Sequence, residues 1–449
     1  MSLEEVLNFL PQDASEAVVE SNFSKALLKA LGFDDQEMVP GFKVGNLAVD
    51  HAARKNQGSD IFLHTLQNPY LYMEVKGRSE NLGDENSPKY KSTALQLKRY
   101  LQHPASASVK WGLLTNSFHI QLFRKHGKVV HPVTPILALD GNVDTVVKDI
   151  KQRIENPKRA LTVAVYNNKG GVGKTTTTLN LAATLAMGKK RVLIIDFDPN
   201  QSDLGDALNF PPLDGEVLET LFYNHDIRKI IKTYEFKNTS LKEPISFDII
   251  LADRKFGLEL TERDLSVKLK LHDLRKALKS VWNDYDYIFI DSPPNWRIFA
   301  QKAIYAADVV LLPARHDNLN SLQNAGTAIT KFIPEIQTER QKNEQEAGPI
   351  ALPIFMNSAF KETGAQIQMM HKAIARIILD TRKNTSDTPG FDLTPYFYPK
   401  YRASHKDLSI MSIPYMAYIS KSDFQHMPAA FAFKAAREQY VNLIREYFL

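Results

Sequence analysis

A glycine-rich segment, NNKGGVGKTTTT at residues 167–178, constrains the fold of this 449-residue chain more than any other stretch. A strand-like apolar run at residues 161–168 leads into it, and a helix is predicted over residues 175–187. Gly170, Gly171 and Gly173 let the backbone wrap closely around a phosphate group, because glycine has no Cβ. The loop N–H groups and the N-terminus of the helix supply positive dipoles. The order strand, loop, helix therefore predicts a phosphate-binding loop.

The second part of the chain repeats short, almost continuous apolar runs separated by helical stretches. These runs are LTVAVYNN, RVLIIDFD, YDYIFIDSPP, ADVVLLPAR and PIALPIFMN. Strands buried on both faces that alternate with helices indicate a parallel sheet. We therefore expect a doubly wound α/β domain over residues 160–449. Residues 214–280 are charged and irregular, and we interpret them as an elaborated connection between two strands.

The first part of the chain has a mixed α+β pattern, and we predict a separate domain over residues 1–142. An amphipathic helix is expected at residues 17–31 and a loop at 41–53. SDIFLHT and YLYMEVK are strand-like, and LQLKRYLQ is helical. The stretch from residue 110 to 130 predicts two further strands with a turn at His126-Gly127. A polar helix and a short connector at residues 143–159 are predicted to link the two domains.

Composition excludes some classes of protein and leaves others open. The chain has no cysteine, which excludes disulfides and thiolate metal sites and fits a reducing cytoplasm. The N-terminus lacks the plan of a secretory signal, and no apolar run reaches the roughly 18 residues of a membrane span. The net charge of +5 permits nucleic-acid binding without requiring it. We expect a cytoplasmic protein.

The octapeptide KGGVGKTT resembles the deviant Walker A motif of the ParA/MinD ATPases. A loop of this kind implies ATP and Mg²⁺ as cofactors, with Lys174 reaching the β- and γ-phosphates and Thr175 binding the metal. Val172 and Thr176 complete the nucleotide-binding segment. The resemblance implies that Lys169 crosses to the nucleotide of a second subunit, so that ATP joins a homodimer.

Downstream segments extend this resemblance. LIIDFDPNQSDLGDAL resembles the family's D-x-D-P-Q segment, although Asn200 stands where glutamine is commoner. The resemblance implies that Asp198 positions the attacking water and that Asp196 lies near the water shell of the metal. YDYIFIDSPPNW resembles Walker B, which makes Asp291 a Mg²⁺-binding residue. Asn357 follows a later strand where such ATPases contact adenine, although an asparagine there is often only a turn residue.

The same family divides into members that bind DNA without sequence preference and members that bind membranes. The C-terminal stretch AAFAFKAAREQYVNLIREYFL is amphipathic, but it has few cations and carries aromatic residues at core-like spacing. We therefore expect a docked terminal helix rather than a membrane anchor. Late basic residues favour DNA as a cluster, although each alone is typical of a solvated surface. These residues are Lys361, Arg382, Lys383, Lys400 and Arg402.

YMEVKGR, at residues 72–78, raises the question of a second site. Side chains alternate along a strand, so Glu74 and Lys76 share one face. If SDIFLHT pairs with this strand across a connection at residues 67–69, two of the registers place Asp60 on the same face, and a slip of one residue removes it. Carboxylates that converge on Mg²⁺ beside a lysine that polarises water fit the PD-(D/E)XK nuclease pattern.

Two further features resemble the N-terminal nuclease domain of type I restriction subunits. Glu20 lies on an early predicted helix, and Gln96 and Tyr100 lie one helical turn apart after the lysine. LLTNSFHIQLFR resembles the strand pair that follows in those subunits. Ser59 stands where proline usually precedes the aspartate.

The sequence thus supports three functional hypotheses. The first is a ParA-like ATPase that dimerises on ATP, binds DNA near the nucleoid and drives DNA partition or cargo positioning. Such an ATPase usually works with an adaptor or centromere-binding protein that stimulates hydrolysis. The second is an ATP-regulated, Mg²⁺-dependent endonuclease of a restriction or phage-defence type. In the third, the first domain is only a docking or DNA-binding module, because folds are reused for other functions.

Overall fold

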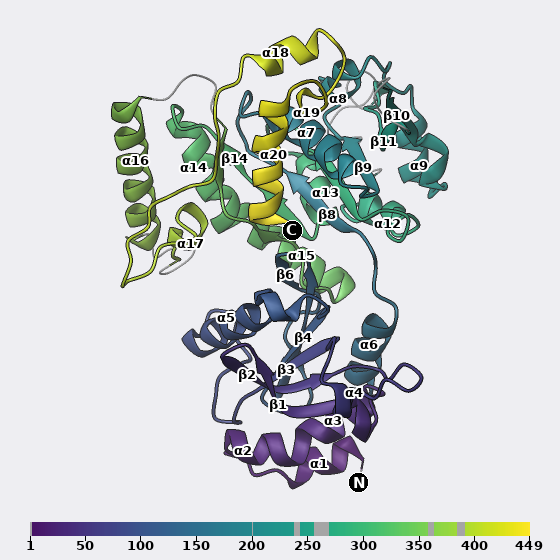
Figure 1. Cartoon of the computed structure of the whole chain (residues 1–449), viewed down its shortest axis with the longest axis vertical. Helices are drawn as coiled ribbons and strands as arrows, with labels where there is room; N and C mark the ends of the chain where they lie inside the picture. Colours follow the sequence, from purple (N-terminus) through teal and green to yellow (C-terminus); the bar gives the residue numbers. More distant parts are fainter. Residues whose placement is uncertain (1, 200, 238–242, 256–268, 358–362, 384–390) are drawn as a thin grey trace. The chain divides into compact units, whose positions relative to one another are not determined.

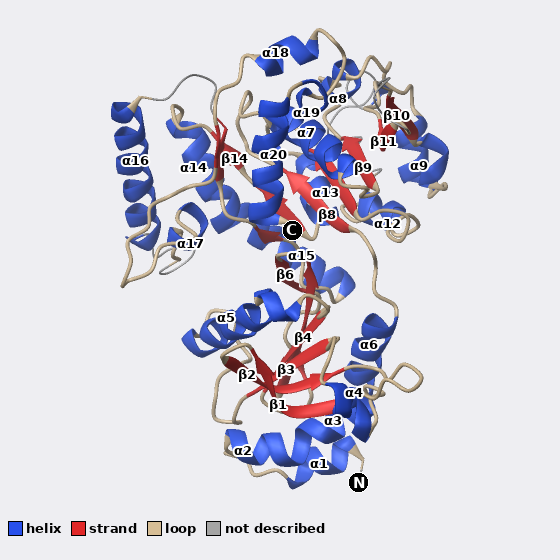
Figure 2. Ribbon diagram, in the orientation of Figure 1, coloured by secondary structure: helices blue, strands red, loops and turns tan. Residues whose placement is uncertain are grey.

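A computed structural model describes residues 2–199, 201–237, 243–255, 269–357, 363–383 and 391–449. These residues fall into two compact units. The first comprises Met1–Pro157 with Arg340–Ala347 and Phe448, and the second comprises Lys158–Glu339 with Gly348–Tyr447 and Leu449. No helix in the described ranges is both long and apolar enough to cross a membrane. Figures 1 and 2 show the elements of each unit.

The first unit is built on a mixed sheet in the order β1-β2-β3-β4-β5-β6, with β7 beside β5. Only the pairing of β3 with β4 is parallel among these strands. The strands are β1 (Met38–Val44), β2 (Leu47–Ala53), β3 (Leu71–Val75), β4 (Trp111–Thr115), β5 (His119–His126), β6 (Val129–Pro132) and β7 (Leu137–Ala138). The helices are α1 (Leu3–Phe9), α2 (Glu16–Val19), η1 (Glu20–Ser24), α3 (Lys25–Ala30), η2 (Asp35–Glu37), α4 (Phe62–Thr65), α5 (Pro88–Gln102), η3 (Pro104–Ser106) and α6 (Val143–Glu155).

The alternation along β3 divides the core of this unit into two layers. Leu71, Met73 and Val75 pack with apolar residues of α1, η1, α3 and α6, whereas Tyr72 packs with residues of α5. Strand side chains point alternately to the two faces of a sheet, so both faces of β3 are buried. Glu74, on the same face as Tyr72, is therefore fully buried as well.

Several predictions for this unit are confirmed. YLYMEVK contains β3, LQLKRYLQ lies in α5, and β5 ends at the predicted turn. The early helix is present as α2, η1 and α3, where η1 is a π-helical turn. A helix is present within residues 143–159 as α6, but its apolar side packs into the core of the first unit, so α6 belongs to that unit and is not a separate connector.

Three other predictions for this unit are wrong. Residues 41–53 form most of the β1–β2 hairpin rather than a loop. The stretch at residues 110–130 holds three strands, β4, β5 and β6, rather than two. SDIFLHT is not a strand, because its second half is α4. Phe62, at the start of α4, is fully buried and stacks on Phe42. The apolar residues of this segment therefore do not alternate between two faces as they would in a strand.

The second unit contains the predicted parallel sheet, in the order β10-β11-β9-β12-β8-β13-β15, with helices on both faces (Figure 2). A smaller parallel sheet has the order β14-β16-β17. The strands are β8 (Leu161–Val165), β9 (Val192–Asp196), β10 (Lys232–Phe236), β11 (Ile245–Ile250), β12 (Tyr287–Asp291), β13 (Val309–Leu311), β14 (Pro313–Ala314), β15 (Ile350–Ala351), β16 (Phe355–Asn357) and β17 (Ser412–Ile413).

The helices that begin in this unit run from the phosphate loop to the C-terminus. They are α7 (Lys174–Met187), α8 (Asp203–Ala207), α9 (Glu216–Tyr223), η4 (Ile227–Ile230), α12 (Asp273–Leu278), α13 (Ile298–Ala306), α14 (Leu319–Thr327), η5 (Ala328–Phe332), α15 (Ile333–Glu344), α16 (Gly364–Lys383), α17 (Thr394–Phe397), α18 (Tyr418–Asp423), α19 (Ala429–Ala432) and α20 (Lys434–Tyr447). The docked terminal helix is confirmed, since α20 lies beside α7 (Figure 1) and buries Tyr440, Leu443 and Ile444.

The supposed connection at residues 214–280 holds more structure than expected. It contains β11, which pairs in parallel with β9 and extends the main sheet. β10 then pairs antiparallel with β11 at the edge. Asp253, just after β11, accepts hydrogen bonds from the backbone N–H groups of Gly215, Val217 and Leu218 at 2.8–3.0 Å. The start of α9 is therefore fixed to the end of β11.

Candidate phosphate-binding and acidic sites

The phosphate loop lies between β8 and α7, as predicted. Gly171 and Gly173 have φ angles of +72° and +82°, which favour glycine. A Cβ on Gly173 would lie 2.1 Å from Nδ2 of Asn357. Asn357, at the end of β16, donates from this nitrogen to the carbonyl of Val172 at 3.1 Å. The residue predicted to contact adenine thus lies directly against the loop.

Lys174 is the buried cation of this loop, with 8% of its surface exposed. Its Nζ donates to the carbonyl of Lys169 at 3.2 Å. Burial lowers the pKa of Lys174, and the charges of Asp291 and Asp198 oppose that shift. The side chain of Lys169 is partly exposed. A buried ammonium group held by a loop carbonyl is suited to neutralise charge on a phosphate.

Two carboxylates meet beside the loop because neighbouring parallel strands end together. Asp291 of β12 is level with Asp196 of β9 and with Val165 of β8. Thr175 Oγ1 donates to Asp291 Oδ2 at 2.6 Å. Burial raises the pKa of Asp291 to about 7, and burial followed by the charge of Asp291 raises the pKa of Asp196. Neither Oδ1 atom accepts a hydrogen bond from any described residue.

Asp198 lies two residues beyond the end of β9 and is 7% exposed. Its charge adds to the factors that raise the pKa of Asp291 and Asp196. The structure therefore brings Asp196, Asp198 and Asp291 into one electrostatic cluster with Lys174. Asn200, at which the segment departs from the family pattern, lies outside the described residues.

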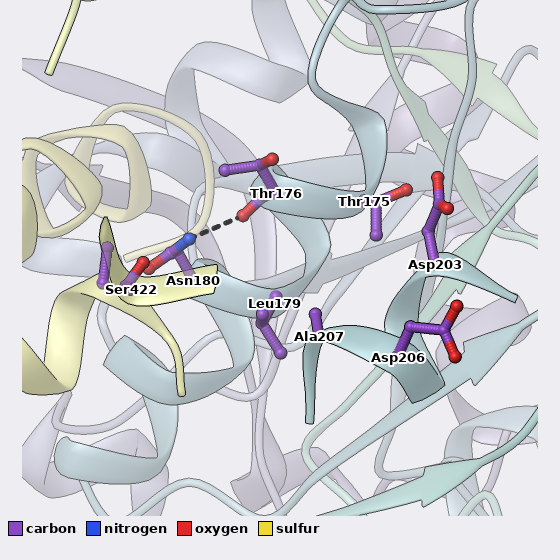
Figure 3. Close-up of a pocket in the computed structure, with 9 residues that line it drawn as sticks. Thr175, Thr176, Leu179, Asn180, Asp203, Asp206, Ala207 and Ser422 are labelled. Carbon is purple, nitrogen blue, oxygen red and sulfur yellow. Dashed lines mark hydrogen bonds between the residues drawn. The ribbon is translucent and has the colours of Figure 1, made fainter. Parts of the chain in front are cut away.

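A pocket of about 330 Å³ adjoins the start of α7 (Figure 3). α7 contributes Thr175, Thr176 and Asn180, and α8 contributes Asp203 and Asp206. Asn180 Nδ2 donates to the carbonyl of Thr176 at 2.8 Å, the contact drawn in Figure 3. The sequence did not single out Asp203 or Asp206, although both lie in the quoted segment that begins with LIIDFD.

The basic residues predicted to contact DNA do not form one unpaired set. Arg382 pairs with Asp392 at 2.8 Å, and Lys400 pairs with Glu446 at 3.5 Å. Arg402 donates to the carbonyls of Pro399 and Tyr401. Lys383 is exposed at the end of α16. Lys361 lies outside the described residues.

In the first unit, Glu74 and Lys76 are the centre of a buried polar cluster. Lys76 Nζ lies 2.8 Å from Glu74 Oε1, and Gln96 Nε2 donates to the same oxygen at 2.6 Å. Gln96 Nε2 also donates to Tyr100 OH at 2.9 Å. Burial, followed by the charge of Asp50, raises the pKa of Glu74 to about 7. Glu74 Oε2 is buried and accepts no hydrogen bond from any residue in the described ranges.

The predicted position of Asp60 is wrong, because the partner of β3 is β2 rather than residues 59–65. Asp60 instead forms two hydrogen bonds with Arg54, at 2.7 and 2.8 Å. These bonds to Arg54 and one to Thr65 lower the pKa of Asp60 to about 2. Asp60 therefore binds the Arg54 guanidinium and is not part of the Glu74 cluster.

The acid that sequence reasoning missed is Asp50, in the middle of β2. Its Oδ2 accepts a hydrogen bond from the backbone N–H of Val75 at 2.6 Å, between Glu74 and Lys76. Burial raises the pKa of Asp50. The signal was present in LAVDHAA, an acid within a short apolar run. Because the sequence predicts a loop over residues 41–53, it does not point to this acid.

Two acids of the early helical segment complete this cluster. Glu16 Oε1 lies 3.1 Å from Lys76 Nζ. Burial, followed by the charges of Asp50 and Glu16, raises the pKa of Glu20. His51 Nε2 lies 3.7 Å from Glu20 Oε1, but burial lowers the pKa of His51 to about 4. The imidazole is therefore neutral near pH 7, and the contact is not an ion pair.

The acidic side chains of this cluster surround the ammonium group of Lys76 and leave no space for a metal ion between them. Among the described residues, no three His, Asp or Glu side chains converge closely enough to hold a metal ion. Lys76 Nζ lies between Glu74 and Glu16 and also donates to the carbonyl of Val75. A cation at Glu74 requires this ammonium group to move.

Comparison with known proteins gives a family model and several relatives. A family model described as an AAA domain matches residues 160–345. A ParA family protein of Chlamydia pneumoniae is 30% identical over 226 residues, which cover 49% of this chain and 82% of that protein. The chromosome partitioning protein ParA of Myxococcus xanthus is 35% identical over 153 residues, 34% of this chain and 50% of that protein.

The chain spans about half the length of several curated relatives that it matches. Among solved structures, the ATP complex of Cyanothece McdA is similar, with 21% sequence identity and a TM-score of 0.45. That similarity covers 64% of this chain and 96% of the other.

Proposed function

The chain belongs to the ParA family of P-loop ATPases, and from that premise we propose that its second unit binds and hydrolyses ATP. The observation that carries this proposal is the convergence of Lys174, Thr175 and Asp291 at the start of α7. Lys174 is buried beside the loop, and Thr175 Oγ1 is 2.6 Å from Asp291. Phosphoryl transfer depends on positioning and on charge neutralisation more than on a strong base. The loop N–H groups and Lys174 supply the positive charge.

Mg²⁺ fits the residues beside this loop. Asp196 and Asp291 each keep a buried oxygen that accepts no hydrogen bond from the described residues, and both carboxyls have raised pKa values. A divalent cation stabilises the charged form of such carboxyls. Thr175 and Asp291 would hold the ion, with Asp196 near its water shell, and the ion would supply charge neutralisation for the transferred phosphoryl group. Asp198 would orient the attacking water.

The proposed cellular role is DNA partition or cargo positioning by an ATP-bound homodimer. Lys169 supports this role, because it is partly exposed at the loop and available to a second subunit. DNA is the proposed surface, with the protein at the nucleoid in the cytoplasm, and an adaptor or centromere-binding protein is the proposed activator. Of the basic residues, Lys383 is the strongest candidate for a phosphate contact, since Arg382 and Lys400 are already paired.

Phosphate release by three variants tests the proposal. Lys174→Ala is expected to abolish turnover, whereas Lys434→Ala, which removes an exposed lysine on α20, is expected to retain it. Asp198→Ala is expected to bind ATP without hydrolysis and to remain on DNA as a dimer, measured by light scattering and DNA retention. Unchanged hydrolysis by Lys174→Ala would overturn the assignment.

A second function is favoured by the cluster around Glu74. We propose that the first unit is a nuclease-type domain whose metal-binding acids are Asp50 and Glu74, with Glu20 nearby and Lys76 as the residue that polarises water. Asp50 replaces Asp60 in this assignment, since Asp50 contacts the backbone between Glu74 and Lys76. The buried, unpartnered Glu74 Oε2 is suited to accept a cation once Lys76 moves away from Oε1.

Nicking of supercoiled plasmid with Mg²⁺, with and without ATP, tests this second function. Glu74→Gln, Lys76→Ala and Asp50→Asn are expected to remove cleavage. Asp60→Asn is the matched control, because it changes an acid of the same unit that binds Arg54 instead. Equal loss in the Asp60 and Asp50 variants, with both folded by circular dichroism, would reject the assignment of Asp50. No cleavage by the wild type under any nucleotide condition would leave a docking or DNA-binding module.

A further inference from the structure

Trp296 lies in the loop between β12 and α13, five residues after Asp291, and forms a three-ring cluster with Phe332 and Tyr166. Its ring is stacked on Phe332, with centroids 4.1 Å apart and an interplanar angle of 7°. Tyr166 contacts it edge-on at 6.0 Å and an angle of 65°. Offset stacked and edge-to-face geometries are the favourable arrangements of aromatic rings. The cluster therefore fixes the orientation of the indole.

The loop that carries Trp296 is also held at its other end. Ser292 is 1% exposed and donates from Oγ to the carbonyl of Val165 at 2.6 Å. Pro293 and Pro294 lie between these two attachments. Proline restricts φ, so the tether from Asp291 to Trp296 is short and stiff. The position of Trp296 is therefore coupled through a short segment to the backbone next to Asp291.

Both attachments, of Ser292 to Val165 and of Trp296 to Tyr166, lie at the start of the phosphate loop. Val165 ends β8, and Tyr166 follows it directly. Asn167 Nδ2 donates to the carbonyls of Pro313 and Ser321 at 2.9 and 3.0 Å. The three-ring cluster thus joins the loop after Asp291 to the same backbone from which the phosphate loop begins.

Phe332 is the ring on which the indole of Trp296 stacks. It ends η5, a π-helical turn between α14 and α15. A π-turn inside a helical run shifts the direction of the following side chains, and such turns are frequent at functional sites. Here the turn ends at the residue on which the indole stacks. Trp296 and Phe332 are each only partly buried, and both pack against the apolar core that contains Tyr166.

We propose that Trp296 is a positioning residue for Asp291: its stacking on Phe332 holds the carboxylate in place and sets the turnover rate rather than nucleotide affinity. This inference rests on the proposed ATP hydrolysis. Trp296 acts through the loop that follows Asp291, whereas the affinity for ATP comes from the phosphate loop, in which none of the variants below changes a residue. A misplacement of about 1 Å costs roughly 100-fold in rate.

Steady-state kinetics of four variants test the inference. Trp296→Ala is expected to lower kcat by about 10- to 100-fold with a change in KM below about threefold. Trp296→Phe keeps a ring for stacking and is expected to restore most of kcat. Phe332→Leu removes the partner ring and is expected to show the same loss of kcat, and the double variant is expected to fall no further than Trp296→Ala. Binding of a fluorescent ATP analogue gives affinity independently of turnover.

The outcomes separate the inference from the proposed function. A wild type that releases no phosphate would overturn the ATPase proposal itself. Hydrolysis by the wild type together with an unchanged kcat in folded Trp296→Ala, or in Phe332→Leu if the alanine variant unfolds, would overturn the positioning role. Equal losses in Trp296→Ala and Trp296→Phe, or a loss that appears only in KM and analogue affinity, would also overturn it.

Discussion

Lys302 on α13 is fully buried, and its replacement by methionine is expected to stabilise the second unit. The Nζ donates to the carbonyl of Lys270, and no surface of the residue is exposed. Burial lowers the pKa of Lys302 to about 8, although the charge of Asp273 opposes that shift. The ordinary pKa of a lysine is about 10.4. The folded chain therefore holds the charged form at a cost.

The magnitude follows from the shift in pKa. A difference of about 2.5 pKa units corresponds to roughly 3 kcal/mol at 1.36 kcal/mol per unit. The unfolded chain binds more protons than the folded chain between about pH 8 and pH 10.5, so the stability of the wild type rises with pH through that window. Below pH 8 the full cost is present. Loss of the hydrogen bond to Lys270 offsets about 1 kcal/mol. Lys302→Met should thus gain about 1–3 kcal/mol at pH 7, with a smaller gain at pH 10.

Urea unfolding at pH 7 and pH 10, followed by circular dichroism, measures this effect. Lys372→Met, at an exposed position of α16, is the matched control and should change stability by less than about 0.5 kcal/mol. If Lys302→Met destabilises the protein at pH 7, or if its gain does not shrink at pH 10, burial of the ammonium group is not the cost inferred here.

Two further predictions concern local geometry in the same unit. Gly173→Ala should weaken ATP binding at least about 10-fold, because a side chain at positive φ costs about 1–2 kcal/mol and its Cβ would overlap Asn357. Adding Asn357→Ala should recover part of the affinity. A fluorescent-nucleotide titration measures both effects. Asp253→Ala should lower the free energy of unfolding by about 3 kcal/mol, since it leaves the N–H groups at the start of α9 without their acceptor. Asp253→Asn should lower it by less, and thermal unfolding of both variants is the check.

Local motifs explain why the arrangement of the glycine-rich loop between a strand and a helix was predicted better than the arrangement of the acids in the first unit. The loop residues that surround a phosphate are contiguous, so their spacing is visible in the sequence. Asp196 and Asp291 come together because neighbouring parallel strands end at the same edge, and the register of β12 with β9 places them level. Two side-chain contacts near the loop could not be predicted from the sequence. The amide of Asn357 on Val172 and the stacking of Trp296 on Phe332 both depend on side-chain positions set by distant segments.

Strand pairing in the first unit shows where sequence reasoning failed. Alternation placed Glu74 and Lys76 on one face, but it contained no information about which strand lies beside them. The short separation between SDIFLHT and β3 suggested a hairpin. In the structure, β2 takes that place, and residues between β2 and β3 form α4 and the bidentate Arg54–Asp60 contact. A similar loss of long-range information concealed β11 within residues 214–280.

Glu74 and Asp291 share an electrostatic environment although they lie in different folds. Each is a buried carboxyl at or near a strand end, each has a pKa of about 7, and each has a lysine among the charges that oppose that rise. A carboxyl of ordinary pKa would be fully ionised at pH 7 without help from a cation. Burial at these two positions costs stability, and neighbouring acids increase that cost through like-charge repulsion. Sites that retain such a cost are typical of function, and a divalent cation is the partner that we propose for each of the two carboxyls.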